Sequence, residues 1–304
     1  MSQNHYEGTL EWDLQESEFG QYGDGSAQYN DRPMNAQRRS LSSSAADLAH
    51  KTSNSSTSLQ AEGGLGFTFD KTLRARQVRD NRTDGQMWLA EFCQRAGRYD
   101  DMLKIMEDVI NSQEPGLPLF KEQQKLVFFA YERHIREQRR SLHYAEGEPG
   151  GRFQGVLAHY ITGKKREIDE KCQAILRVLD AYVLPFAVSD EDRAYVYKLR
   201  GDYSRYLAEI HEGESRIKCM KASSFCYQKA YQLVTKKSIS PVSALSLGVI
   251  LNYSIFLSEF MKEMDKSQAI VRQALTYTTD SAALEAEDDE TIYGMIELLR
   301  ERIA

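Results

Sequence analysis

From Asp84 to the C-terminus, apolar residues return at helical spacing almost without interruption, and no other feature constrains the fold as strongly. One segment shows the i, i+3, i+4, i+7 pattern most clearly, at Cys172, Ile175, Leu176, Leu179, Tyr182 and Val183. Pro185 ends this segment because its nitrogen has no hydrogen to donate. We find no run of alternating β-branched residues bounded by turn signals. The sequence therefore predicts an all-α fold.

The helical pattern divides into nine segments. Their expected ranges are 84–98, 100–113, 118–145, 153–184, 190–212, 215–238, 242–262, 264–281 and 288–303. The short connections between them imply antiparallel neighbours. The stretch 146–155, which is rich in glycine, is the strongest internal break and predicts a loop.

Residues 1–83 show no sustained period and are rich in Gly, Asn, Gln and Ser. This composition predicts a disordered extension, so we divide the chain into that extension and a helical domain at 84–304. Residues 1–31 carry seven acidic and no basic side chains, unlike the start of a secretory signal. We therefore expect a cytoplasmic protein, with access to the nucleus left open.

Charge and motif content narrow the function classes. A net charge of -6 gives no general attraction to nucleic acid or to an anionic membrane, so we expect neither as a partner. We recognise no nucleophile–base set, no clustered metal ligands and no phosphate loop, and we expect no enzyme activity, cofactor or metal. The cysteines include no CxxC motif and are expected to be reduced core thiols, at Cys93, Cys172, Cys219 and Cys226.

One helical face is strongly charged. It carries Lys198, Asp202, Arg205 and Glu209. Two interpretations stay open. The residues form i, i+4 ion pairs on a solvated surface, or Arg205 and Tyr206 donate to an oxyanion while Asp202 and Glu209 hold the basic side chains in place.

A second basic cluster runs from Arg133 to Arg140. These two residues are seven apart and therefore share one helical face. Alone, the cluster is typical of a solvated basic surface. Meeting Arg205 and Tyr206 in space, it would form a dianion site in which each charge-assisted hydrogen bond contributes about 1.5–3 kcal/mol.

The segment 242–262 is apolar on more than one side. A stripe suited to a core contains Val242, Leu245, Val249, Tyr253, Phe256 and Phe260, and a second row contains Leu247, Leu251 and Ile255. A helix with two apolar faces is either wholly buried or lines a groove as well as a core. The pattern alone favours full burial.

Four blocks of sequence resemble the 14-3-3 family and occur in the family's order: Arg98–Met102, Arg139–Ser141, Gly201–Glu209 and Leu247–Phe256. The similarity covers about residues 84–304, and the blocks GDYSRYLAE and LGVILNYSIF are the most specific. The resemblance implies a nine-helix dimeric bundle with a concave groove. It also implies a non-enzymatic adaptor in signal transduction that clamps phosphoserine or phosphothreonine segments of client proteins.

In that family an Arg–Tyr pair joins a Lys and an Arg of another helix to hold the phosphate. Arg205 and Tyr206 match the pair. Two alignments of the other helix stay open: one places Glu132 and Arg139 at the Lys and Arg, and the other places Arg133 and Arg140 there. Electrostatics favours the second, because a glutamate beside a dianion weakens binding, but that alignment needs a one-residue insertion in the helix.

The resemblance also assigns the peptide groove. Asn252 matches a residue that bonds the ligand backbone. Arg302 replaces a second such Asn, so it either reaches ligand acids or obstructs the groove, and Gly294 stands in place of a groove Leu. The matched apolar wall is Leu251, Ile255 and Leu298, and the matched polar positions are Lys198, Asp202 and Glu259.

At the dimer interface, the resemblance implies roles for Arg98, Asp101, Tyr160 and Glu167, whereas Gly163 replaces the family's Lys. We still expect a homodimer, because apolar burial contributes more than a surface ion pair.

The sequence also supports two further hypotheses, one about a self-ligand and one about an alternative function. Arg39–Ser42 resembles a 14-3-3 ligand motif, so phosphorylated Ser42 would be a self-ligand. The alternative function is that of a helical scaffold that binds unphosphorylated protein segments and has a degenerate phosphate pocket.

Overall fold

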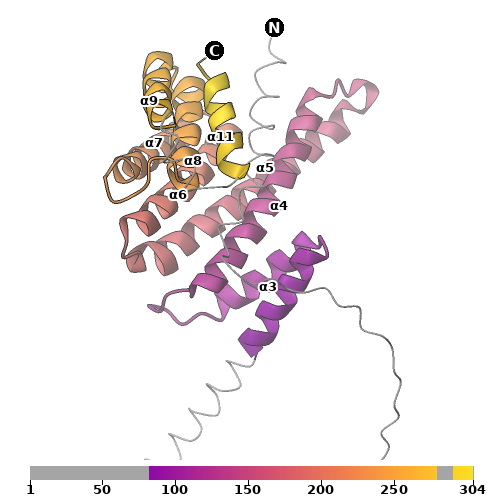
Figure 1. The fold of residues 1–304 in the computed structure, drawn as a ribbon. Helices are drawn as coiled ribbons and strands as arrows, with labels where there is room; N and C mark the ends of the chain where they lie inside the picture. Colours follow the sequence, from indigo (N-terminus) through magenta and orange to yellow (C-terminus); the bar gives the residue numbers. More distant parts are fainter. Residues whose placement is uncertain (1–81, 279–289, 304) are drawn as a thin grey trace, which may run out of the picture. The chain divides into compact units, whose positions relative to one another are not determined.

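The structure, a computed structural model, describes residues 82–278 and 290–303. In these ranges it contains nine α-helices and no strand, which confirms the predicted all-α fold (Figure 1). The first helix covers residues 82–95. The others are α3 (Tyr99–Asn111), α4 (Lys121–Gly147), α5 (Gln154–Val178), α6 (Asp190–Ile210), α7 (Gly213–Val234), α8 (Ala244–Ile255), α9 (Met264–Tyr277) and α11 (Glu290–Glu301). Ser42 and residues 1–81 of the predicted extension lie outside the described residues.

Local sequence signals explain several helix ends. Ser189 begins α6, because its hydroxyl oxygen accepts a hydrogen bond of 2.9 Å from the backbone N–H of Asp192. Ser243 caps α8 in the same way, through the N–H of Ser246. After α5 the chain continues as a short π-helix, Leu179–Val183, and a 3-10 turn, Leu184–Phe186, which contains Pro185. The helical path therefore ends at the predicted proline.

Helices that follow one another in the chain pack against one another. α4 and α5 are two long helices that lie side by side, and α8, α9 and α11 form a group (Figure 1). One apolar core cluster draws on α3, α4, α5 and α6, and includes Met102, Val127, Ile168 and Tyr203. A second draws on α7, α8, α9 and α11, and includes Tyr227, Phe256, Val271 and Leu299.

Gly201 brings α6 and α7 close together. A Cβ atom at this position would lie 2.8 Å from the Tyr227 ring, closer than real Cβ contacts allow. The Ser223 hydroxyl also donates to the Gly201 carbonyl oxygen at 2.9 Å. The absence of a side chain at Gly201 therefore leaves room for the Tyr227 ring, whose hydroxyl donates to the next residue, Asp202.

Helix α8 is buried along nearly its whole length. Every residue from Leu245 to Ile255 is buried, which confirms the full-burial interpretation of this segment. None of the helices within residues 82–278 and 290–303 combines the length and the apolar composition that a membrane span requires.

Candidate functional site

Glu209 on α6 joins two arginines from different helices. Its Oε1 accepts from Arg205 Nη1 at 3.0 Å, and its Oε2 accepts from Nε and Nη2 of Arg139 at 3.0 and 2.8 Å. Arg205 is 1% exposed and Arg139 is 7% exposed. Buried arginines need such a partner, because an unpaired charge away from water is costly. One carboxylate thus holds two guanidinium groups near each other.

The Tyr206 ring lies against both guanidinium groups. The guanidinium carbon of Arg139 is 3.9 Å from the ring centroid, and that of Arg205 is 4.7 Å away. Both distances are within the range of cation–π attraction. Arg139 from α4 and the Arg205–Tyr206 pair from α6 therefore meet in one place, as the oxyanion interpretation expected.

The other two arginines predicted for this cluster lie elsewhere. The guanidinium of Arg133 lies over the Tyr99 and Phe129 rings, 5.4 and 5.1 Å from their centroids. Arg140 pairs with Glu137 and is half exposed. Because α4 is continuous, a neighbour in sequence is turned by about 100° around the helix axis. Of the two alignments, the one that pairs Glu132 with Arg139 places its arginine beside Glu209 and Tyr206.

Arg136 was not singled out by the sequence analysis, although it lies on the same face of α4. Its Nη2 is 2.9 Å from Glu132 Oε1, and its side chain is 6% exposed. Residues 132, 136 and 139 follow the i, i+4, i+7 spacing of one helical face. That spacing was available in the sequence and could have identified Arg136. This face carries one acid and two arginines.

Asp202 organises the polar residues next to Arg205. Its Oδ1 accepts from Asn252 Nδ2 at 2.9 Å and from the Tyr227 hydroxyl at 2.5 Å, and its Oδ2 is 3.1 Å from Lys198 Nζ. Arg205 Nε in turn donates to the Tyr227 oxygen at 3.3 Å. Burial and the nearby Asp202 carboxylate raise the pKa of Tyr227. A buried hydrogen-bonded network therefore replaces the solvated surface that was the simpler interpretation of this face.

The matched groove residues are mostly buried. Leu251, Ile255 and Leu298, which the resemblance matched to the apolar groove wall, belong to the second core cluster. Arg302 donates to the Ser258 hydroxyl and lies 3.9 Å from Glu259. Burial lowers the pKa of Arg302. Arg302 is thus held against the π-helical continuation of α8, Phe256–Phe260.

The residues matched to a dimer interface make contacts within the protomer. Arg98 Nη2 lies 2.7 Å from Asp101 Oδ2, and this hydrogen bond raises the pKa of Arg98 and lowers that of Asp101. Glu167 is 3.0 Å from Lys164 Nζ and 3.1 Å from His134 Nε2.

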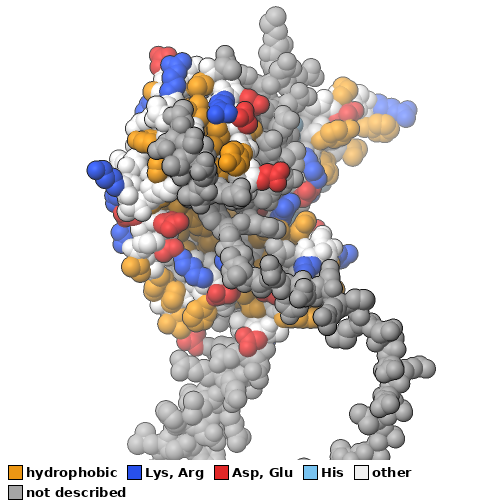
Figure 2. Space-filling view, in the orientation of Figure 1, with side chains coloured by type: hydrophobic (Ala, Val, Ile, Leu, Met, Phe, Trp, Pro, Cys, Tyr) orange, Lys and Arg blue, Asp and Glu red, His pale blue; other side chains and the backbone are white. Residues whose placement is uncertain are grey.

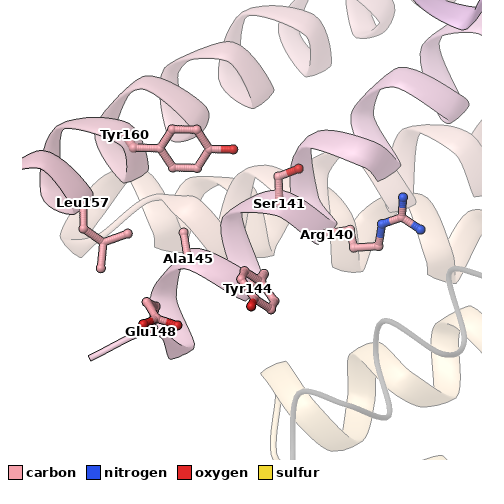
Figure 3. Close-up of a pocket in the computed structure, with 7 residues that line it drawn as sticks. All are labelled: Arg140, Ser141, Tyr144, Ala145, Glu148, Leu157 and Tyr160. Carbon is pink, nitrogen blue, oxygen red and sulfur yellow. The ribbon is translucent and has the colours of Figure 1, made fainter. Parts of the chain in front are cut away.

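Tyr160 lines a pocket of about 470 Å³ between the end of α4 and the start of α5. Figure 3 shows the Tyr160 ring facing Ser141 across this pocket, with Leu157 beside it on the same helix. Hydrophobic side chains gather on the surface at this end of the α4–α5 pair (Figure 2). The exposed ones are Tyr144, Phe153, Val156 and Tyr160.

Comparison with known proteins settles the family. A family model described as 14-3-3 protein matches residues 89–304. The chain belongs to the 14-3-3 family. It is 28% identical over 227 residues to 14-3-3-like protein B of Glycine max, across 71% of this chain and 91% of that protein. It is 32% identical over 190 residues to 14-3-3 protein zeta of Bombyx mori, across 61% of this chain and 75% of that protein.

The yeast protein BMH1 is similar to the same extent, with 29% identity over 231 residues, 72% of this chain and 84% of that protein. Proteins of the 14-3-3 family are non-enzymatic adaptors that act on protein partners, so the chain is an adaptor of this kind rather than an enzyme. In the part of the chain that the structure describes, no group of three or more His, Cys, Asp or Glu residues is arranged to hold a metal ion.

Proposed function

We propose that this 14-3-3 protein binds phosphoserine or phosphothreonine segments of client proteins and that Arg139, Arg205 and Tyr206 hold the phosphate. The observation that carries the proposal is the meeting of two buried guanidinium groups, from α4 and α6, around Tyr206 and Glu209. A guanidinium has five N–H groups in a planar fork, so one arginine can serve both a carboxylate and a phosphate. Each such bond to a dianion contributes about 1.5–3 kcal/mol.

Arg136 is a second source of positive charge at this site. Arg136 pairs with Glu132, and Glu209 pairs with both Arg139 and Arg205, so these two neighbouring groups together carry a formal charge of +1. Glu132 lowers the attraction for a phosphate, whereas Arg136 offsets Glu132. We infer that the pocket binds a dianion more weakly than it would without the Glu132 carboxylate.

The client peptide would contact the network around Asp202. Asn252 and Lys198 both lie within hydrogen-bond distance of the Asp202 carboxylate, which fixes the two side chains beside Arg205. A peptide backbone next to the phosphate would exchange hydrogen bonds with the Asn252 amide. Contacts of the ligand with Leu251, Ile255 and Leu298 would require these buried side chains to become exposed.

Titration calorimetry with a phosphoserine peptide and its unphosphorylated twin tests this function. We expect the phosphorylated peptide to bind at least tenfold more tightly, and Arg139→Gln to abolish that preference. Arg140→Gln is the matched control, because Arg140 is the next residue on α4 and pairs with Glu137 on the surface. Equal affinity for both peptides would overturn the proposal and favour a scaffold for unphosphorylated segments.

We also propose that two copies of the chain form a homodimer. Exposed apolar side chains on the helix 82–95 of one copy would contact the apolar pocket between α4 and α5 of the other. On the helix 82–95, Trp88 and Phe92 stack with their ring centroids 6.0 Å apart, and both remain exposed together with Leu89. The pocket around Leu157 and Tyr160 offers an apolar recess for such side chains. Apolar surface of this extent on a folded domain is typical of an interaction site.

Sedimentation velocity tests the dimer. We expect a dissociation constant of about 1 µM or below for the dimer, so the protein is studied at about 10 µM. At that concentration the wild-type chain should sediment as a dimer, and the double variant Trp88→Ser, Tyr160→Ser as a monomer. Val188→Ser is the control, since Val188 is also exposed but belongs to the loop between α5 and α6. A monomeric wild-type chain would contradict the proposal.

The cytoplasmic location stays a prediction.

A further inference from the structure

Three residues from separate elements, which are not part of the arginine cluster, are joined by two consecutive contacts. Cys219 Sγ lies 3.6 Å from His211 Nδ1, and His211 Nε2 lies 2.7 Å from Asp169 Oδ1. Asp169 belongs to α5, His211 follows the last residue of α6, and Cys219 lies in the second turn of α7. Gly213, with φ of 55°, allows the sharp turn between α6 and α7 that brings His211 and Cys219 face to face.

The contact with Asp169 fixes the tautomer of the neutral imidazole. A carboxylate only accepts hydrogen bonds, so the proton must lie on Nε2 of His211. The lone pair on Nδ1 then faces the Cys219 thiol, whose S–H can donate to it. A thiol, an imidazole that can take its proton and an acid that orients the imidazole are the three parts of an activated sulfur nucleophile.

Cys219 also differs from the other cysteines in exposure. Cys93, Cys172 and Cys226 are buried, as expected for core thiols, whereas Cys219 is partly exposed. The structure thus corrects the expectation that all four thiols lie in the core. The contacts of His211 with Asp169 and Cys219 were not recognisable in the sequence because they join residues 42 and 8 positions apart.

The thiol of Cys219 is not acidic by itself. Partial burial and the nearby Asp169 carboxylate raise its pKa. Little free thiolate would therefore be present at neutral pH, and a reaction at this sulfur needs a base that removes the proton as the sulfur attacks. His211 Nδ1 is located where that base is required.

We propose that Cys219 is a site of oxidation by hydroperoxides, with His211 as its base and Asp169 as the residue that orients His211. In this step the sulfur attacks one peroxide oxygen, an S–O bond forms and the O–O bond breaks. The thiol proton passes to His211 and then to the departing hydroxide, which leaves as water when the oxidant is hydrogen peroxide. Sulfur is oxidised to a sulfenic acid and the peroxide oxygen is reduced.

The surroundings favour a small oxidant. The pocket beside Tyr160 is lined by none of the three residues, and neither is a second, smaller pocket that Lys121 and Asp192 line. Hydrogen peroxide needs no binding cavity, unlike a peptide or a large metabolite. Oxidation of Cys219 does not depend on phosphopeptide binding, because the reaction takes place at a thiol and the oxidised cysteine is detected by its mass.

The test is peptide mapping of the full-length protein after brief treatment with hydrogen peroxide in the presence of dimedone, which traps sulfenic acids. Cys219 should be labelled at least tenfold faster than Cys226, which is buried. His211→Gln should lower the rate at Cys219 about tenfold or more, in line with the usual contribution of a general base. His159→Gln, a change at an exposed histidine on α5, should leave the rate unchanged.

Asp169 supplies a second and independent readout. Asp169→Asn should slow labelling several-fold, and Asp169→Glu should restore most of the rate, because it returns an acceptor for the Nε2 proton. Circular dichroism melting curves identify any variant that fails to fold. Labelling of Cys219 no faster than that of Cys226, or an unchanged rate in folded His211→Gln, would overturn the proposal.

Discussion

The two sides of the arginine pocket are built differently. On α6, Asp202 is held by Lys198, Asn252 and Tyr227. Arg205 donates to Tyr227 and pairs with Glu209. On α4, Arg139 pairs with Glu209, while Glu132 and Arg136 pair with each other one turn away. The α6 side therefore has the rigidity expected of a binding site, whereas the α4 side combines attraction and repulsion for an anion.

The largest effect should follow from removing a charge on the α6 side. Arg205→Gln is expected to weaken binding of a phosphoserine peptide about 100-fold, which corresponds to about 2.7 kcal/mol. Arg200→Gln is the matched control on α6, because Arg200 pairs with Asp180 on the surface. Titration calorimetry measures both. If Arg205→Gln lowers the affinity for the phosphoserine peptide less than about threefold, Arg205 does not bind the phosphate.

The second-largest effect should be a loss of folding stability when the hydrogen-bonded network on the α6 side is disrupted. Asp202→Asn removes the negative charge that Lys198 approaches and replaces an accepting oxygen by a donor. We expect the free energy of unfolding in urea to fall by about 2 kcal/mol. Asp180→Asn, which affects a half-exposed ion pair, should cost less than about 1 kcal/mol. Similar losses for the two variants would show that the α6 network is no more rigid than a surface pair.

The α4 side should respond in the opposite direction. Glu132→Gln removes a carboxylate near the phosphate and should tighten phosphopeptide binding about fivefold, or about 1 kcal/mol. Adding Arg136→Gln should cancel most of that gain. Glu137→Gln is the control, because Glu137 pairs with the exposed Arg140. Unchanged affinity for Glu132→Gln would mean that this carboxylate is too far from the ligand to matter.

The smallest effect is expected at Tyr203, between the two sides. Its side chain is buried, its hydroxyl has no hydrogen-bond partner among the described residues, and burial raises its pKa well above 10.0, with Glu132 as the next cause. Because the folded pKa exceeds the unfolded one, stability is full below about pH 10 and declines as the pH rises further.

Tyr203→Phe should therefore change stability by less than about 0.5 kcal/mol at pH 7. It should also reduce the decline of the melting temperature between pH 10 and pH 11, as measured by circular dichroism. Tyr277→Phe, at an exposed tyrosine, serves as the control. Identical alkaline profiles for the wild type and Tyr203→Phe would show that Tyr203 does not cause that decline.

The same difference between the sides explains what the sequence could reveal. On the α6 side, the spacing within Gly201–Glu209 indicated that Asp202, Arg205 and Glu209 share one helical face, but it left open whether that face is solvated, because the partners Tyr227 and Asn252 come from other helices. The continuous apolar pattern likewise predicted the burial of α8. On α4, the two alignments differed by a single residue, and only the position of Glu209 on another helix decides which arginine reaches the pocket. Long-range partners of this kind leave no local pattern.

A crystal structure of the protein with a bound phosphoserine peptide is the most direct measurement. We expect phosphate oxygens within about 3 Å of the guanidinium nitrogens of Arg139 and Arg205 and of the Tyr206 hydroxyl. A phosphate bound instead by Arg133 or Arg140, or by none of these residues, would contradict the account.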